Sequence, residues 1–327
     1  MIYNACVPQL KIADIFRSNN LLVVCFYCGE PKDILVNKTS SCKKIICPEG
    51  FSSLLFFDIK ESTKYYISYK NTEYCVSANT YNDHKRKFTL STMVKNEDDY
   101  IIPWIKFHQS IGFEHFVIYD NSQVSDKTSW TSSSDKSDLK LVLKDYVDNG
   151  LVTLINWNVP KRINGRLYGQ ASQQTHSLHA FSKSNYICYI DIDEYINLKK
   201  DKNINEFIKS INTDKKINCF CFRSRLFHNS KNKSEDPSDF LLIDTCDAVL
   251  DGARRKSIVK TRSINTFAIH SPTSASTRYI IPKGLAYINH YFFLNKNYRG
   301  RDSAKYVDKS ILRHIINNEN INSCTGL

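Results

Sequence analysis

The stretch YICYIDIDEYI, residues 186–196, joins an apolar strand to a cluster of acidic side chains. Its first half is an almost unbroken apolar and aromatic run, typical of a strand that is buried on both faces in a parallel sheet. Its second half places Asp191, Asp193 and Glu194 directly after that strand. Because ligands of open α/β sheets bind beyond the carboxyl ends of the strands, the stretch predicts a ligand site there.

The spacing of the two aspartates suits a metal ion. Alternate residues of an extended segment point the same way, so Asp191 and Asp193 can face one ion while Ile192 points into the core. A divalent cation is a natural partner, because hard cations take carboxylate oxygens and share them with substrate phosphates. Isolated Asp-x-Asp pairs are also common at solvated strand ends, so the interpretation depends on the surrounding pattern.

The surrounding pattern is an alternation of strands and helices. We expect strands at residues 89–94, 116–119 and 151–156, and helices at 98–110, 139–147 and 166–183. Such alternation predicts an α/β fold with a mostly parallel sheet and helices on both faces. Polar candidates fall where the expected strands end, namely Lys95, Asn96, Glu97, Asp120, Asp191 and Asp193.

The chain divides into two parts. Residues 1–88 alternate short strand-like runs with turn residues and predict a small β-rich N-terminal segment. Residues 89–327 form the expected α/β domain, which continues through a helix at 204–211 and shorter strands at 218–223, 257–260, 266–270 and 287–293.

Composition narrows the class of protein. The 327 residues carry a net charge of +12, with basic side chains scattered among acidic ones, so we expect a locally positive cleft and no nucleic-acid partner.

No apolar window approaches the ~20 residues that span a bilayer, and the N-terminus lacks a signal-peptide pattern. We expect a cytoplasmic or particle-associated protein without a membrane anchor; the sequence leaves its oligomeric state open.

The 11 cysteines fit buried free thiols in a reducing compartment, since several lie in apolar runs. One group, Cys25, Cys28, Cys42 and Cys47, could instead bind zinc or form a disulfide. Against zinc, residues 23–28 have the pattern of a strand, which would place Cys25 and Cys28 on opposite faces.

Four blocks of the chain resemble glycosyltransferase family 92, a family with the GT-A (Rossmann-like) fold. They are VKNE with PWIKFH at 94–97 and 103–108, GFEHFVIYDN at 112–121, YGQ at 168–170, and DIDEYI at 191–196. Two shorter segments, KSIV at 256–259 and NHY at 289–291, resemble the family more weakly. The resemblance as a whole extends from about residue 89 to residue 300. The chain departs from the family at Pro103, where glutamate is usual, and after Tyr291.

The resemblance implies a glycosyltransferase that uses a UDP-sugar and Mn²⁺ or Mg²⁺. Galactose, glucose or N-acetylglucosamine would pass, with inversion, to a hydroxyl of a glycan, glycoprotein or glycolipid. A divalent ion that bridges the two phosphates stabilises the charge that builds on the leaving group.

Asp193 is the expected direct ligand of the metal. Asp191 is expected either to bind the metal as well or to contact the ribose. A histidine from the C-terminal half would complete the set, His290 first and His270 second; each could instead be a hydrogen-bonded structural histidine. Glu194 is expected to support the loop.

Donor contacts are expected from the other strand ends. Glu97 and Asp120 suit ribose hydroxyls or a uracil N–H, with helix capping and an Asx-turn as structural alternatives. The remaining donor-binding candidates are Lys95, Asn96, Gln170 and Lys256, with Arg254 and Arg255 beside the last. The general base that inversion needs is assigned to Asp251, with Asp247, Asp239 and Asp236 as rivals.

Two other classes of function remain as alternatives. A nucleotidyltransferase would share the Asp-x-Asp chemistry but should carry a Gly-rich phosphate loop, which residues 95–97 are not. A degenerate GT-A domain could act as a glycan- or nucleotide-binding module, but it should have lost a metal carboxylate, and this chain keeps both Asp191 and Asp193.

Overall fold

The structure is a computed structural model. It describes residues 84–124, 138–160, 168–227, 245–247, 250–273, 277–291 and 306–314, and within the first 81 residues the stretches 2–5, 10–18, 20–27, 34–38, 42–46, 53–58, 62, 64–69 and 72–81.

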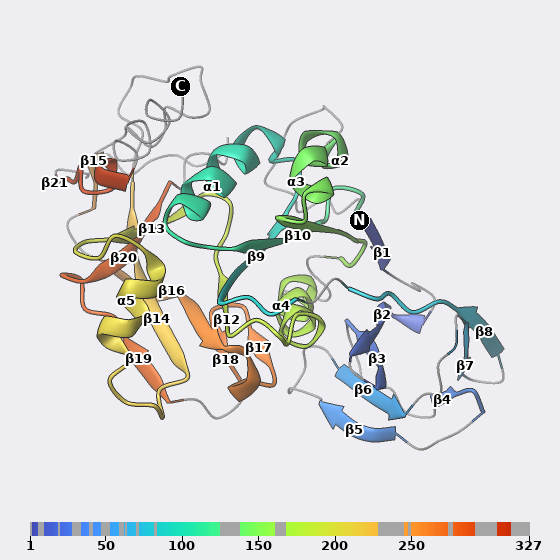
Figure 1. Ribbon diagram of the computed structural model, residues 1–327. Helices are drawn as coiled ribbons and strands as arrows, with labels where there is room; N and C mark the ends of the chain where they lie inside the picture. Colours follow the sequence, from blue (N-terminus) through green and yellow to red (C-terminus); the bar gives the residue numbers. More distant parts are fainter. Residues whose placement is uncertain are drawn as a thin grey trace.

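A ten-stranded sheet organises these residues, and one half of it is parallel (Figure 1). In spatial order this half holds β1 (Ile2–Ala5), β11 (Val152–Trp157), β10 (His115–Asp120), β9 (Phe88–Val94) and β12 (Tyr186–Tyr189). Every neighbouring pair in it is parallel. The first strand of the chain therefore lies in the large sheet rather than with the rest of the N-terminal segment.

The other half of the sheet is mixed. Its strands are β16 (Asp251–Lys260), β14 (Cys219–Leu226), β20 (Ala286–His290) and β13 (Glu194–Leu198), with β19 (Arg278–Ile280) also paired to β14. β16 runs antiparallel to both β12 and β14, and β13 runs antiparallel to β20. The predicted parallel sheet is thus found on one side of β12, and a mixed sheet on the other.

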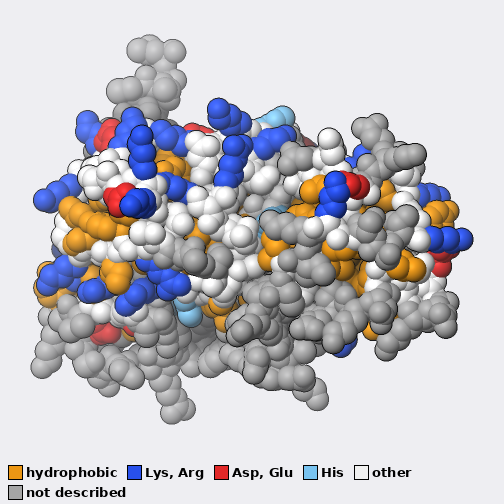
Figure 2. Space-filling model, turned by 90° about the horizontal axis from the view of Figure 1, so that it is seen from below, with side chains coloured by type: hydrophobic (Ala, Val, Ile, Leu, Met, Phe, Trp, Pro, Cys, Tyr) orange, Lys and Arg blue, Asp and Glu red, His pale blue; other side chains and the backbone are white. Residues whose placement is uncertain are grey.

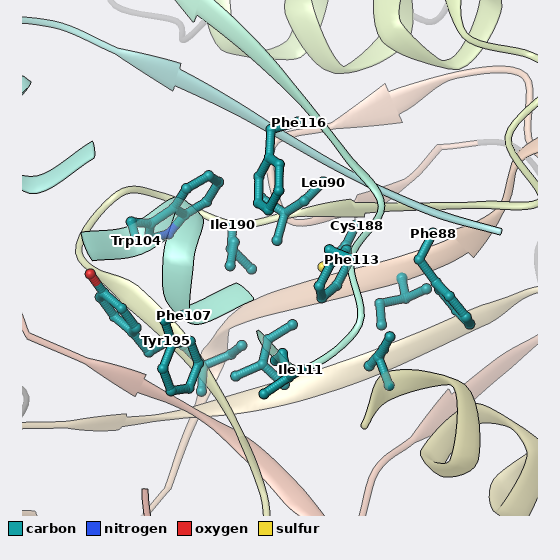
Figure 3. Close-up of a cluster of buried hydrophobic side chains, with 14 of the residues drawn as sticks. Phe88, Leu90, Trp104, Phe107, Ile111, Phe113, Phe116, Cys188, Ile190 and Tyr195 are labelled. Atoms are coloured by element: carbon teal, nitrogen blue, oxygen red, sulfur yellow. The ribbon is translucent and has the colours of Figure 1, made fainter. Parts of the chain in front are cut away.

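Helices cover both faces, as the alternation predicts. α1 (Asp98–Ser110), α2 (Leu139–Val142), α3 (Lys144–Asp148) and α5 (Ile204–Ile211) share one core with the sheet. Figure 3 shows part of this core, where Trp104 of α1 lies beside Phe116 and Phe107 of α1 lies beside Tyr195. α4 (Tyr168–Ala180) packs on the opposite face. Among the described residues, no helix is long and apolar enough to cross a membrane.

The bounds of several elements differ from the sequence prediction; the longest extension is in β16, which covers Asp251–Lys260 where a strand at 257–260 is expected. The expected helix at 139–147 is two short helices that meet at Leu143. The described part of the helix expected at 166–183 is Tyr168–Ala180. The chain leaves the sheet after Tyr189, turns at residues 190–193, and enters β13 at Glu194, four places away across the sheet.

The N-terminal segment is β-rich, and it packs on α4. One antiparallel sheet holds β2 (Ile12–Ser18), β3 (Leu21–Phe26), β6 (Ser53–Asp58) and β5 (Cys42–Ile46), and a second holds β4 (Leu35–Val36), β7 (Tyr65–Tyr69) and β8 (Thr72–Val76). Two further pairs lie in the C-terminal half: β15 (Thr245–Cys246) with β21 (Tyr306–Val307), and β17 (Phe267–Ala268) with β18 (Ser271–Pro272).

The cysteine group proposed for zinc is only partly described. Cys25 is a fully buried free thiol on β3, and Cys42 is half-buried on β5. Cys28 and Cys47 lie outside the described residues. The zinc interpretation stays a prediction.

A buried polar network joins the N-terminal segment to α4 and the large sheet. Asp14 accepts hydrogen bonds from Tyr81 Oη at 2.5 Å and Asn79 Nδ2 at 2.7 Å, and lies 2.8 Å from His176 Nε2. The other ring nitrogen of His176 lies 2.7 Å from Tyr119 Oη on β10. Because Asp14 and His176 are both essentially inaccessible to solvent, these bonds are made without competition from water.

Replacement of Asp14 by alanine should destabilise the fold by roughly 3 kcal/mol, because Tyr81, Asn79 and His176 would lose a shared acceptor inside the protein. Urea unfolding measures the loss. Asp58→Ala is the matched control, since Asp58 forms an exposed pair with Lys43 and such pairs contribute little. Equal losses in the two variants would contradict the role given to Asp14.

Candidate active site

The parallel strands bring the predicted site residues to one edge of the sheet. Asp120 of β10 stands opposite Val94 of β9, and Tyr189 of β12 stands opposite Ser91 of β9. The chain segments that follow these strands are therefore neighbours, as the Asn121 backbone N–H donating to Val94 O at 2.8 Å shows.

The acidic turn encloses a buried lysine. Lys256, which begins the apolar half of β16, places its ammonium 2.5 Å from Asp191 Oδ2 and 3.1 Å from Glu194 Oε2. The Lys256 side chain is only 4% exposed and that of Glu194 is 0% exposed, so this ion pair lies out of water. The Asp191 side chain is 40% exposed, so the other ion pair lies partly in contact with solvent. Glu194 Oε2 also accepts the Asp191 backbone N–H at 2.9 Å.

Gln170 completes the surroundings of Asp191. Its Nε2 donates to Asp191 Oδ1 at 3.1 Å from the first turn of α4. Both carboxylate oxygens of Asp191 are thus engaged within the protein, one by α4 and one by β16.

Burial and neighbouring charges shift the pKa values of Glu194 and Lys256 in opposite directions. Burial raises the pKa of Glu194 to about 7, against the opposing effect of Lys256. Burial alone would lower the pKa of Lys256, but the carboxylates of Asp191 and Glu194 outweigh it and hold that pKa above its ordinary value. Lys256 is therefore charged at neutral pH and neutralises the turn.

His290 faces the second aspartate. Its Nε2 lies 3.2 Å from Asp193 Oδ2 and its Nδ1 lies 3.7 Å from Glu194 Oε1. The Tyr291 backbone N–H donates to Asp193 O at 2.8 Å, which holds the end of β20 against the turn. Burial opposes a charge on His290, but the carboxylate of Asp193 outweighs it and the pKa of His290 is raised.

Helix α1 fixes the backbone of the turn. Trp104 Nε1 donates to Glu194 O at 3.1 Å and to Asp191 O at 3.2 Å. His108, one turn later, lies with its Nδ1 2.8 Å from Trp104 O and its ring stacked on Tyr195 of β13. Burial lowers the pKa of His108 to about 3, so the imidazole is neutral.

Three of the donor-binding candidates on the neighbouring strand ends, Lys95, Asn96 and Asp120, bond to residues 122–124, which follow β10. Asp120 Oδ1 accepts the Ser122 backbone N–H at 2.9 Å, which is the Asx-turn alternative. Asn96 has a positive φ of 53°, and its N–H donates to Ser122 Oγ at 3.2 Å. Lys95 Nζ donates to Val124 O at 2.6 Å. Glu97 occupies the N-cap position of α1 without a side-chain capping bond.

The other candidates lie further from the turn or outside the described residues. His270 follows β17 (Phe267–Ala268), where its carbonyl accepts from Ser257 Oγ at 3.4 Å. Asp251 begins β16 opposite Ser224, and Asp247 bonds to Leu226 O. Asp236, Asp239 and the side chain of Arg254 are outside the described part of the chain.

Sequence reasoning missed two features of this site. It placed Lys256 among the donor-binding candidates and did not pair it with Asp191 and Glu194, although a lysine beginning an apolar strand is a signal for a buried partner. It gave no role to Trp104, whose indole N–H holds the backbone of the turn.

The geometry is that of an α/β protein with a cluster of charged side chains at the carboxyl edge of its parallel strands. The family model of glycosyltransferase family 92 matches residues 84–324. The chain belongs to glycosyltransferase family 92.

Curated relatives carry the same family name. A glycosyltransferase family 92 protein of Ricinus communis is 24% identical over 209 residues, covering 62% of this chain and 34% of the relative. One of Oryza sativa subsp. japonica is 22% identical over 227 residues, covering 64% and 35% respectively. The chain thus spans about a third of the length of these relatives.

Solved structures are similar over parts of the fold. The apo structure of the bifunctional glycosyltransferase WbbM has a TM-score of 0.30 at 9% identity, covering 57% of this chain and 33% of that one. A mycobacterial protein has a TM-score of 0.29 at 10% identity, covering 54% of each chain.

Replacement of Lys256 by methionine should destabilise the protein by about 3 kcal/mol, because Glu194 would remain as a buried acid without its cation and the partly exposed Asp191 would lose the same partner. The double variant Lys256→Met with Glu194→Gln should recover part of the loss, since it removes one of those acids. Urea unfolding of both variants measures this, with the exposed Lys144→Met as control. A double variant less stable than Lys256→Met would contradict the pairing.

Stability should fall as pH drops below 6.5, in part because of His108. The unfolded chain binds a proton at this histidine near pH 6.5 and the native chain does so only near 3, so protonation favours unfolding between these values. His108→Asn should reduce the slope between pH 6 and 4 by about 1.4 kcal/mol per pH unit. The exposed His84→Asn is the control; an unchanged slope in His108→Asn would refute the assignment.

Proposed function

We propose that this protein is a metal-dependent glycosyltransferase of the GT-A type. It transfers galactose, glucose or N-acetylglucosamine from a UDP-sugar to a hydroxyl of a glycan, glycoprotein or glycolipid, with inversion. The observation that supports this most is the convergence of Asp191, Asp193 and His290 at the carboxyl edge of the parallel strands, in a chain of family 92.

Asp193 and His290 are the residues that would hold the ion. Their facing atoms, Oδ2 and Nε2, lie 3.2 Å apart, and a carboxylate oxygen with an imidazole nitrogen is a donor set that Mn²⁺ accepts. Among the described residues, no group of three or more potential ligands is arranged to hold a metal. The diphosphate of the donor would therefore supply the remaining oxygens, as is usual where few carboxylates bind Mg²⁺. When bound, the ion stabilises the leaving diphosphate as a Lewis acid.

Asp191 has a different task in this proposal. Lys256 and Gln170 hold its two oxygens, so Asp191 fixes the turn and offers the outer lone pairs of its carboxylate to the ribose. Its side chain is 40% exposed, which leaves it accessible to a ligand. Lys256, nearly buried, acts on the donor through Asp191 rather than by contact with the diphosphate.

The nucleoside would lie over the neighbouring strand ends. Lys95, Asn96, Glu97 and Asp120 line the edge beside the turn, and their carboxylates and amide can pair with ribose hydroxyls and uracil. Asp251 lies on the same strand as Lys256, where it pairs with Ser224 of β14, and is the general base of the proposal. His270 becomes the second choice for the metal.

A nucleotide-binding module without activity is the second candidate. The observation that favours it is the ion pair of Lys256 with Asp191, an internal cation in direct contact with the first carboxylate of the motif. Such a module would bind UDP without turning over any UDP-sugar.

Thermal unfolding with UDP, with and without Mn²⁺, tests the donor site. At about 100 times Kd, binding to the native state should raise the midpoint by at least about 3 °C, and only with Mn²⁺. Asp193→Asn should abolish the shift because it removes an anionic ligand, whereas the exposed Asp214→Asn should keep it. Turnover of UDP-galactose, UDP-glucose or UDP-N-acetylglucosamine then separates the enzyme from the binding module. A shift that is independent of Mn²⁺ and of Asp193 would refute the metal site.

A further inference from the structure

The sheet edge opposite the acidic turn joins five segments that are distant in sequence. The Asn185 N–H donates to Arg86 O, the Thr261 N–H to Asn185 O, the Lys260 N–H to Asn218 O, and the Asn218 N–H to Thr277 O, all within 2.9–3.1 Å. We name this surface the basic edge and define it as residues 84–87, 183–185, 214–218, 260–262 and 277–278.

The basic edge concentrates the positive charge of the chain. Nine of its seventeen residues are Lys or Arg and one is Asp, against 45 Lys and Arg in 327 residues overall. Six of the nine are exposed and the other three half-buried; the exposed ones are Lys85, Lys183, Lys215, Lys216, Arg262 and Arg278. So dense a cluster of one sign creates a potential that attracts polyanions.

Figure 2 shows the molecule from this side. Lys and Arg side chains gather over the half that holds α5, β14 and β19, with few Asp and Glu among them. Next to Arg278 on β19, Ile280 is 40% exposed, and Pro282 follows it at the surface. The charged surface thus has an apolar margin.

We propose that the basic edge binds the surface of a bilayer that contains anionic lipids. Lys and Arg near an anionic leaflet each contribute to binding by electrostatic attraction, and a bordering apolar side chain can enter the headgroup region. This interaction is separate from sugar transfer, and it would hold whatever reaction the acidic turn performs.

The composition of the edge favours lipid over nucleic acid. Proteins that bind single strands stack bases on aromatic side chains, and the seventeen residues contain no Phe, Tyr or Trp. The edge consists of strand ends and turns joined by backbone hydrogen bonds, and its margin is apolar. A duplex bound through phosphates alone is the competing outcome of the test.

The arrangement fixes which side of the protein faces the bilayer. β9 and β12 run from the basic edge, at Phe88 and Tyr186, to the acidic turn beyond Tyr189. A protein bound through the basic edge therefore presents Asp191 and Asp193 away from the lipid, toward the surrounding solution.

Sedimentation with vesicles tests the proposal on the whole chain. The protein should bind vesicles of phosphatidylcholine and phosphatidylserine in a 7:3 mixture, not phosphatidylcholine alone, and about 0.3 M NaCl should release it. The variant Lys85→Glu, Lys215→Glu, Lys216→Glu, Arg262→Glu should bind at least about tenfold more weakly.

The matched control reverses four exposed lysines elsewhere, Lys38, Lys64, Lys106 and Lys140. This control has the same net charge and should keep most of the binding; unchanged melting temperatures verify that both variants fold. Equal loss in both variants would mean that only net charge matters and would overturn the proposal. So would the absence of binding to phosphatidylserine vesicles, or tighter binding to a 20-base-pair duplex that the first variant alone loses.

Discussion

The ion pair of Lys256 with Asp191 and Glu194 is the interaction on which the site depends. Three carboxylates follow one strand, and without a cation their mutual repulsion and burial would open the turn. β16 supplies that cation from inside the sheet, with a side chain that is only 4% exposed. Trp104 holds the backbone of the same turn from α1, Gln170 holds Asp191 from α4, and His290 approaches Asp193 from β20. Four elements from distant parts of the chain therefore set the position of two aspartates.

The sequence predicts best those elements whose bounds depend only on their own side chains. α1 and α5 begin and end where their apolar spacing indicates, because each has one buried face and clear terminal residues. The parallel direction of β9, β10, β11 and β12 also follows from the strand–helix alternation. The convergence of the candidate residues at one edge was predictable for the same reason, since parallel strands end on one side.

The sequence could not predict the contacts that depend on which strands pair in the sheet. β16 pairs antiparallel with β12, and this pairing places Lys256 at the turn. The alternation of side chains within a strand does not identify its partner strand. The same holds for β1, where four residues ahead of the β-rich segment join the far edge of the large sheet. Between His290 and His270, only the register of β13 with β20 brings one imidazole opposite Glu194 and against Asp193.

The stretch at residues 186–196 also constrains the order in which the molecule can assemble. β12 and β13 are consecutive in the chain, yet β16, β14 and β20, all of them later in the sequence, lie between them in the sheet. Contacts of this kind are non-local and form slowly, because loop closure precedes the gain from pairing. During synthesis, the parallel half can pack on α1 and α4 as soon as it emerges, while the acidic turn stays without Lys256 and His290 until residue 290 has been made. The site is then a late product of folding, and a chain that stops before β20 would have the Asp-x-Asp motif but not its geometry.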